Sequence, residues 1–230
     1  MIEKRLEQVY QTIAAAAEKS GRKADAITLI AVTKTHSAEE INRAIRAGVT
    51  DIGENKVQEI LEKYDDVLPV RWHLIGHLQT NKVKYIIDKV SMIHSVDSIH
   101  LMDEIERQAK KHNIQMDILI QVNISGEETK FGIRPEEIPE FLAHAEELTN
   151  TKVRGLMTIA PKINTNMSNR LHFDNIREIF IDISAKKYDN ISMEYLSMGM
   201  SGDYPEAIEA GSNMVRVGSA IFGERNYQNV

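Results

Sequence analysis

The apolar positions near the start of the chain predict an amphipathic helix. They recur at spacings of three and four residues, at Ile2, Leu6, Val9, Ile13, Ala16 and Ala17. Such spacing places the apolar side chains on one face of a helix. Gly21 follows at a position where helices commonly end. We therefore expect a helix over residues 2–19 that precedes the main repeat of the fold.

Beyond this helix, short runs rich in Ile, Val and Leu alternate with polar segments of helical periodicity. The short runs predict eight strands, at Thr28–Val32, Asp51–Gly53, Trp72–Ile75, Met92–Val96, Ile118–Val122, Gly155–Ile159, Tyr195–Ser197 and Met214–Val217. The linking segments predict helices at Ala38–Ala47, Lys56–Tyr64, Asn81–Lys89, Ser98–His112, Pro135–Leu148, Ser168–Lys186 and Tyr204–Ala210. Near-continuous apolar strands are typical of a sheet buried on both faces, and this alternation favours parallel pairing.

Eight strand–helix units in 230 residues predict an α/β fold, a single (β/α)₈ TIM barrel that occupies 1–230 as one domain. The alternative is an open doubly wound sheet. Its dinucleotide-binding motif, G-x-G-x-x-G after the first strand, is absent, because the first strand instead leads into the segment VTKTH. The polar segment at 161–169 is more typical of a variable surface loop than of a lid.

Composition narrows the classes of function. Lys plus Arg number 28 and Asp plus Glu number 34, so the net charge of −6 gives no reason to expect a nucleic acid partner. The absence of cysteine excludes disulfides, zinc–thiolate sites and thiol catalysis. Charged residues interrupt the apolar positions of the first segment, and no apolar run has the length of a membrane span. We expect a soluble, cytoplasmic protein with no membrane partner.

A lysine follows the first predicted strand. Lys34 comes directly after the apolar run 27–32 and Thr33, and barrels of this class have their active sites at the carboxyl ends of the strands. Partial desolvation of such a lysine lowers the pKa of its amine and favours the neutral form that Schiff-base chemistry requires. A lysine that caps the strand end in a salt bridge is the structural alternative.

Two turns rich in glycine and serine follow the seventh and eighth predicted strands. Ser201 and Gly202 precede the short helix predicted at Tyr204–Ala210, and Gly218 and Ser219 follow the last strand. Barrels of this class often bind phosphate at this position, where helix N-termini and glycine backbone approach an anion closely. Ordinary capping explains each turn alone. Two such turns side by side predict a phosphate site.

A reactive lysine that faces a phosphate site implies a phosphorylated aldehyde or ketone. A sugar-phosphate aldolase and a protein that binds pyridoxal 5′-phosphate (PLP) both meet this description. Arg216 lies two residues before Gly218 and so points to the same side of its strand. An arginine beside a pyridine nitrogen would discourage its protonation, whereas an ion pair at the barrel end is the structural alternative.

Several long segments carry a family resemblance. They are AVTKTHS at 31–37, DIGENKVQE at 51–59, WHLIGHLQTNK at 72–82, VNISGEETKFG at 122–132, RGLMTIAP at 154–161 and LSMGMSGDYPEAIEAGSNMVRVGSAIFGER at 196–225. In these segments the chain resembles the pyridoxal phosphate homeostasis proteins, a single-domain group related to the N-terminal barrel of alanine racemase. The resemblance implies that barrel, fold type III among PLP proteins, and PLP as the cofactor.

The resemblance also implies roles for individual residues. Lys34 corresponds to the lysine that forms the internal aldimine with PLP. Arg216 faces the pyridine nitrogen, and Gly218 and Ser219 hold the phosphate. The other cofactor-binding residues that it implies are Asn55, Met198, Ser201, His77 and Met157. No metal site is implied.

The implied function is PLP binding in intracellular vitamin B6 homeostasis, without clear catalytic turnover. The implied partners are PLP, related B6 vitamers and PLP-dependent apo-enzymes, and we expect a monomer or weak homodimer. The alternative is a PLP-dependent amino-acid racemase. We do not expect the second, β-rich domain that racemases of this fold add, and an arginine at the ring nitrogen gives a weaker electron sink than a carboxylate. A protein-binding scaffold is a further alternative, for which no sequence feature marks a surface.

Overall fold

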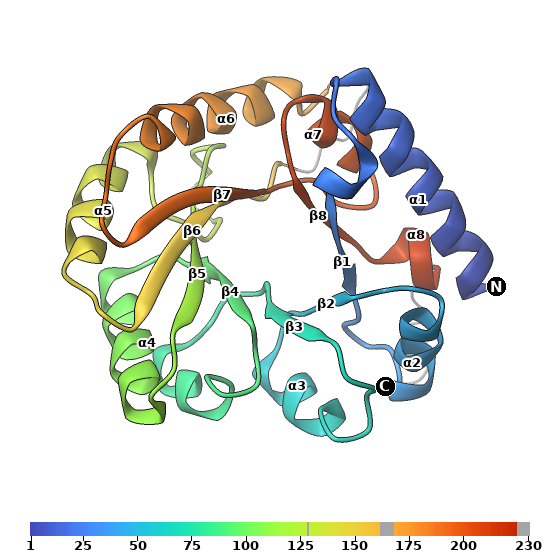
Figure 1. The fold of residues 1–230 in the computed structure, drawn as a ribbon, viewed down its shortest axis with the longest axis horizontal. Helices are drawn as coiled ribbons and strands as arrows, with labels where there is room; N and C mark the ends of the chain where they lie inside the picture. The colour runs from blue at the N-terminus through green and yellow to red at the C-terminus, as the bar shows by residue number, and fades with distance from the viewer. Residues whose placement is uncertain (128, 162–167, 225–230) are drawn as a thin grey trace.

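The eight strands close into one parallel barrel, seen end-on in Figure 1. The structure is a computed structural model that describes residues 1–127, 129–161 and 168–224. The strands follow one another around the barrel in chain order, and β1 pairs with β8 to close it. Their bounds are β1 Thr28–Val32, β2 Asp51–Glu54, β3 Arg71–Leu74, β4 Met92–Val96, β5 Met116–Gln121, β6 Thr151–Met157, β7 Ile191–Ser197 and β8 Met214–Val217. The predicted barrel is thus confirmed.

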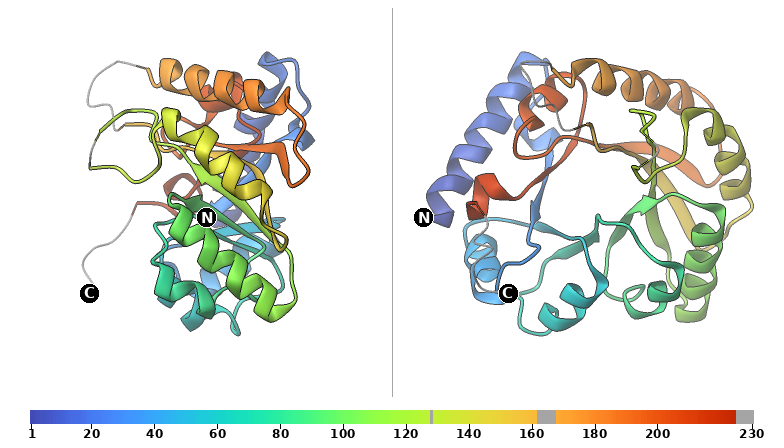
Figure 2. Two further views of the ribbon diagram at one scale, coloured as in Figure 1. Left: turned by 90° about the vertical axis from the view of Figure 1, so that its left-hand side faces the viewer. Right: turned by 180° about the vertical axis from the view of Figure 1, so that it is seen from behind.

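Helices surround the barrel on its outer side (Figures 1 and 2). The α-helices are α1 Ile2–Lys19, α2 Ala38–Arg46, α3 Val57–Lys63, α4 Ile99–His112, α5 Ile138–Glu146, α6 Arg170–Ser184, α7 Tyr204–Glu209 and α8 Ser219–Phe222. Three 3₁₀ helices, η1 Ala24–Ala26, η2 Thr80–Tyr85 and η3 Pro135–Glu137, complete the connections. The additional helix α1 has the predicted bounds and buries all six of its predicted apolar residues. It packs beside α2, α7 and α8.

Apolar side chains form two separate layers. The larger layer lies between the strands and the surrounding helices. The smaller layer fills the barrel interior with Ile30, Met92, Leu119, Met157 and Met214, against which Tyr195 packs. Because side chains alternate along a strand, these inward positions also fix which polar residues point into the barrel. The interior is therefore packed with side chains and is not a channel.

The structure differs from the sequence prediction between β3 and β4. The segment Asn81–Lys89, predicted as a helix, contains a shorter 3₁₀ helix, η2 over Thr80–Tyr85, in place of an α-helix. Its apolar residues Val83 and Ile86 are both fully buried. A three-residue interval suits either kind of helix, so the apolar spacing could not distinguish them.

Strand β6 begins four residues before its predicted start, at Thr151. Lys152 and Arg154 interrupt the apolar pattern there, and Arg154 forms ion pairs with Asp117 of β5 at 3.2 Å and Glu194 of β7 at 2.8 Å. Cross-strand pairs of this kind allow charged residues to occupy a strand. At Gly155, where φ is +151°, an added Cβ would lie 1.8 Å from the carbonyl oxygen of Tyr195. Only glycine fits this close approach of β6 and β7.

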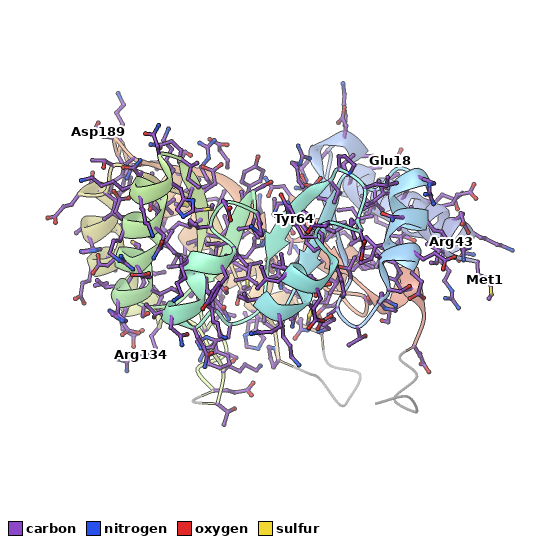
Figure 3. The ribbon with its side chains drawn as sticks, turned by 90° about the horizontal axis from the view of Figure 1, so that it is seen from below. Met1, Glu18, Arg43, Tyr64, Arg134 and Asp189 are labelled. Carbon is purple, nitrogen blue, oxygen red and sulfur yellow. The ribbon has the colours of Figure 1, made fainter. Side chains whose placement is uncertain are left out.

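The two ends of the barrel are distinct. Asp189, which precedes β7, and Arg134, which follows β5, lie at opposite edges of the molecule in Figure 3. The edge near Arg134 is the carboxyl end of the strands, where the sequence predicts the site. Most of the predicted surface loop, 162–167, lies outside the described residues. Among the helices that the structure describes, none is long and apolar enough to cross a membrane.

Candidate functional site

A pocket of about 300 Å³ opens at the carboxyl ends of the strands. Its lining comes from the segments after β1, β2, β3, β6, β7 and β8, and from β1 and β8 themselves. The lining residues are Val32, Lys34, Asn55, Ile75, Ile159, Met200, Ser201, Gly202, Arg216, Gly218 and Ser219. The volume is at the lower end of the range for small-molecule sites, and the mixture of apolar walls with a few polar groups is typical of them.

Six of the nine residues expected at the site meet in this pocket. They are Lys34, Asn55, Ser201, Arg216, Gly218 and Ser219. The first two follow neighbouring strands β1 and β2, and the other four belong to β8 and the turns around it. Since β1 and β8 close the barrel, segments from the two ends of the sequence lie side by side here.

The peptide groups on both sides of Lys34 are held by a cluster of charged side chains. The Thr35 backbone N–H donates to Glu59 Oε2 at 2.7 Å. The ammonium group of Lys63 donates to the Thr33 carbonyl at 3.2 Å, and it also bonds to Glu59 at 2.8 Å and Glu54 at 2.9 Å. Both peptide groups beside the half-buried Lys34 are thereby fixed to α3 and β2. We call Glu54, Glu59 and Lys63 the lysine-strand clamp.

The clamp carboxylates differ in their surroundings. Burial raises the pKa of the fully buried Glu54 above its ordinary value, although Lys63 acts against the rise. Burial also acts to raise the pKa of Glu59, but hydrogen bonds from Lys63 and the Thr35 backbone outweigh it and leave the pKa lowered. Glu59 is therefore a carboxylate at neutral pH, as the acceptor of these bonds must be.

The backbone turns sharply at Thr35. Its φ of +68° is in the left-handed region, which β-branched residues rarely adopt. Its side chain is exposed, so packing of that side chain does not impose the conformation. The bond from the Thr35 N–H to Glu59 restrains the backbone there instead. Unfavourable conformations of this kind persist where the surrounding contacts hold them, and they concentrate at functional sites.

Arg216 is the buried cation of the pocket. Its side chain extends inward from β8, and only 3% of the residue is exposed. Nη1 donates to Ser197 Oγ at 2.7 Å, and Nη2 donates to the Thr158 carbonyl at 2.8 Å. Burial lowers the pKa of Arg216 to about 10, so the guanidinium is charged at neutral pH. These two bonds leave further N–H donors of the five that an arginine carries.

The turns after β7 and β8 are joined through a serine hydroxyl. Ser201 Oγ accepts the Gly218 backbone N–H at 3.0 Å and the Ala220 N–H at 3.4 Å. A Cβ at Gly218 would meet Val32 at 3.3 Å, so glycine lets the chain approach β1 closely. Ser219 begins α8, directly after this glycine. The two turns predicted to bind phosphate therefore form one wall of the pocket.

The other three expected residues do not line the pocket in the part of the chain that the structure describes. Met157 fills the barrel interior, and Met198 belongs to the layer between strands and helices. His77 stacks on Phe131 with the ring centroids 3.9 Å apart, and its Nδ1 lies 3.3 Å from a carboxylate oxygen of Asp97. The structure thus separates these three side chains from the six that converge.

Several lining residues escaped the sequence analysis. Ile75 and Ile159 follow β3 and β6, at the same end of the barrel as the expected residues. Met200 lines the pocket, whereas the family resemblance implied Met198 from the same turn. Position at a strand end could have indicated the two isoleucines. No sequence signal shows which methionine of that turn faces the pocket, because its backbone path is irregular.

A larger groove of about 760 Å³ runs along α1 and shares none of its lining residues with the pocket at the strand ends. Its polar lining includes the acidic residues Glu3, Glu7 and Asp25. Carboxylates disfavour a bound anion, and the groove contains no lysine or arginine. The smaller pocket at the strand ends is therefore the better candidate for an anionic ligand. No cluster suited to a metal ion occurs among the described residues.

Known proteins resemble this chain over nearly its whole length. The profile of the family "Alanine racemase, N-terminal domain" matches residues 5–226. The pyridoxal phosphate homeostasis protein of Aquifex aeolicus is 44% identical over 225 residues, which are 97% of this chain and 98% of that protein. A second relative with the same name, from Escherichia coli K12, is 37% identical and is covered to 96%.

A solved structure extends the comparison to three dimensions. PipY of Synechococcus elongatus, with PLP bound, superposes with a TM-score of 0.83 and is 30% identical. The match covers 97% of this chain and all of the PipY chain. Both the identity and the coverage exceed what a shared barrel alone produces. The chain therefore belongs to the pyridoxal phosphate homeostasis protein family, whose barrel is that of the alanine racemase N-terminal domain.

Proposed function

We propose that this protein binds PLP in the pocket at the strand ends and acts in PLP homeostasis. The proposal rests on the convergence in one pocket of Lys34, Arg216 and the wall formed by the turns at Ser201 and Ser219. A primary amine, a fixed cation and hydroxyl donors are the groups that an aldehyde, a pyridine ring and a phosphate require. The relatives named for pyridoxal phosphate and the PLP-bound PipY support the same ligand.

The chemistry of the donors fits PLP. When bound, the cofactor supplies an aldehyde that combines with a primary amine and a conjugated ring that withdraws electrons. Lys34 is the only lysine that lines the pocket among the described residues, so we assign the amine to it. Ser201, Gly218 and Ser219 present hydroxyl and backbone groups for the phosphate. Asn55 would lie beside the ring.

Arg216 determines the character of the ring site. Its contacts are the neutral oxygens of Ser197 and Thr158, so its positive charge is not cancelled by a carboxylate in contact. A cation beside the pyridine nitrogen opposes protonation there. The ring then withdraws electrons less strongly, and carbanion chemistry on a bound amino acid is disfavoured.

We propose that the protein holds and releases PLP without substantial turnover. A racemase needs proton donors and acceptors on both faces of the bound amino acid. Apart from Lys34, the described lining residues include no aspartate, glutamate, histidine or tyrosine to serve on the second face. This composition favours a protein that binds and releases PLP over the alternative, an amino-acid racemase.

We propose that the protein exchanges PLP and related B6 vitamers with the cytoplasmic pool and that PLP-dependent apo-enzymes are recipients. We propose a monomer or weak homodimer.

Absorbance and deuterium exchange test the proposal together. The purified protein mixed with PLP should gain a visible band, and borohydride should then fix the cofactor to the chain. Lys34→Ala should lose the band. In deuterated water, L-alanine and L-serine should keep their α-protons when incubated with the loaded protein. Rapid exchange at the α-carbon would instead support the racemase, and a protein that takes up no PLP would contradict the proposed ligand.

A further inference from the structure

A row of buried polar side chains crosses the barrel interior, starting at the pocket. Each member points inward from a different strand and hydrogen-bonds to the next. In order, the row comprises Arg216 of β8, Ser197 of β7, His94 of β4, His73 of β3 and Asp51 of β2. All five are at most 3% exposed. We call this row the interior polar chain.

The contacts along the interior polar chain are short. Ser197 Oγ lies 2.7 Å from Arg216 Nη1 and 3.2 Å from His94 Nδ1. His94 Nε2 lies 3.0 Å from His73 Nδ1, and His73 Nε2 lies 2.9 Å from Asp51 Oδ1. These separations are within or close to the usual range of hydrogen bonds. The row is therefore continuous from the pocket to β2.

The far end of the interior polar chain is at the amino end of the barrel. Asp51 is the first residue of β2, and it accepts two hydrogen bonds from Arg71, the first residue of β3, at 2.7 and 2.6 Å. The Thr50 hydroxyl donates to the same carboxylate at 2.7 Å. The Arg71 side chain is 62% exposed, so the cation that neutralises Asp51 lies at the surface, at the end of the row remote from the pocket.

The two ends dictate the direction of the hydrogen bonds. An arginine can only donate and a carboxylate can only accept. If the Ser197 hydroxyl, which accepts from Arg216, donates to His94 Nδ1, then His94 must carry its proton on Nε2 and donate to His73. His73 in turn carries its proton on Nε2 and donates to Asp51. In this arrangement every buried ring nitrogen and hydroxyl in the chain has a partner.

The competing arrangement has a charged His73 that donates from both nitrogens. His94 would then donate from Nδ1 to Ser197, whose own hydroxyl proton would have no acceptor among the described residues. It would also add a third cation between Arg216 and Arg71, in a row whose hydrogen bonds reach one carboxylate, Asp51, among the described residues. Burial is the main cause that holds the pKa of His94 well below its ordinary value, so His94 is neutral in both arrangements. The unpaired Ser197 proton and the added buried charge disfavour the competing arrangement.

We propose that Ser197, His94 and His73 are positioning residues for Arg216, joined to Asp51 by hydrogen bonds that all run one way. This inference rests on the proposed function, in which Arg216 faces the pyridine nitrogen of PLP. The chain orients the guanidinium through a neutral hydroxyl and ends on Asp51 at the opposite end of the barrel, while the charge of Asp203 also acts on Arg216. Arg216 therefore presents its charge toward the pocket while remaining fixed in place.

The imidazole protons of the wild-type protein provide the first test, and this test needs no ligand. Nitrogen-15 NMR of the histidine side chains at neutral pH should show His73 and His94 both neutral, each with its proton on Nε2. A charged His73, or a His94 protonated on Nδ1, would overturn the proposed direction of the chain. His100, which lies outside the chain on α4, is the reference signal.

Two variants at one position provide the second test. Ser197→Ala removes the link, whereas Ser197→Thr retains the hydroxyl. We expect Ser197→Ala to weaken PLP binding about tenfold, the scale of a lost hydrogen bond to a charged group, and to change the pH dependence of the bound cofactor's absorbance. Ser197→Thr should restore both properties. A folded Ser197→Ala protein with the wild-type affinity and spectrum would overturn the positioning role.

The two failures can be told apart. If the wild-type protein takes up no PLP while its histidines carry their protons as proposed, the proposed function is overturned and Arg216 loses its role toward the ring. If the protein binds PLP normally but the histidines have the competing arrangement, the ligand stands and the inference about the interior polar chain is overturned.

Discussion

The unusual backbone at Thr35 gives a prediction in which folding stability and cofactor binding move in opposite directions. A glycine there can adopt the φ of +68° without steric cost. A non-glycine residue in this region costs about 1–2 kcal/mol, whereas glycine adds about 0.5–1 kcal/mol of unfolded-chain entropy. Thr35→Gly should therefore raise the free energy of unfolding by about 0.5–1 kcal/mol.

The same substitution should weaken PLP binding. The stiff backbone at Thr35, held by Glu59, fixes the adjoining Lys34 before the cofactor arrives. Glycine loosens that segment, and re-ordering it on binding costs about 0.4–1 kcal/mol, a factor of about two to five in affinity. Preorganisation lost in this way lowers affinity without removing a contact.

Two measurements and one control check this reasoning. Urea denaturation gives the free energy of unfolding, and absorbance titration gives the affinity for PLP. Asn113→Gly is the matched control, because Asn113 is also exposed and left-handed, with φ +54°, but ends α4 away from the pocket. It should change stability slightly and leave affinity alone. If Thr35→Gly lowers stability, or leaves affinity unchanged, the argument about the strained turn is refuted.

Three further predictions follow from the clamp, the phosphate wall and the interior polar chain. Glu59→Ala should weaken PLP binding about tenfold, because the Thr35 N–H loses its charged acceptor. Glu62→Ala, on the exposed side of α3, is the control and should leave PLP binding unchanged. Equal effects of the two substitutions would contradict the role of the clamp. In titrations with PLP, Ser219→Ala should lose about 1 kcal/mol of binding free energy. Ser201→Ala should lose more, since Ser201 also accepts the Gly218 N–H. Wild-type affinity in both variants would show that the phosphate binds at another place. Hydrogen bonds from His73, Arg71 and Thr50 lower the pKa of Asp51, although burial acts to raise it. The lowered pKa stabilises the folded protein above pH 3.8, and this stabilisation is lost as the pH falls further. Acid denaturation of Asp51→Asn should accordingly be less steep below that pH, and an unchanged profile would contradict it.

The barrel could be predicted from the sequence because its strands are buried on both faces. Strands β1, β4 and β8 have the predicted bounds, since each is a dense apolar run. The start of β6 could not be predicted, because Arg154 is accommodated by ion pairs with neighbouring strands that are distant in sequence. Helical periodicity likewise could not separate the 3₁₀ helix η2 from an α-helix.

The candidate site shows a similar division. The rule that chemistry gathers at the carboxyl ends of barrel strands, together with the family resemblance, directed attention to the six residues that converge in the pocket. The interior polar chain was not predicted. His73 and His94 each lie within an apolar strand, and only the barrel's closure shows that they face one another. Contacts between strands set the direction of inward side chains, and a single sequence does not encode those contacts locally.

We propose Lys34 as the amine that binds PLP. Borohydride reduction of the loaded protein, followed by proteolysis and mass spectrometry of the modified peptide, identifies that amine directly. We expect to recover the reduced cofactor on Lys34 and to find no modified peptide from Lys34→Ala. Recovery of the cofactor on Lys63, Lys56 or another lysine would contradict it.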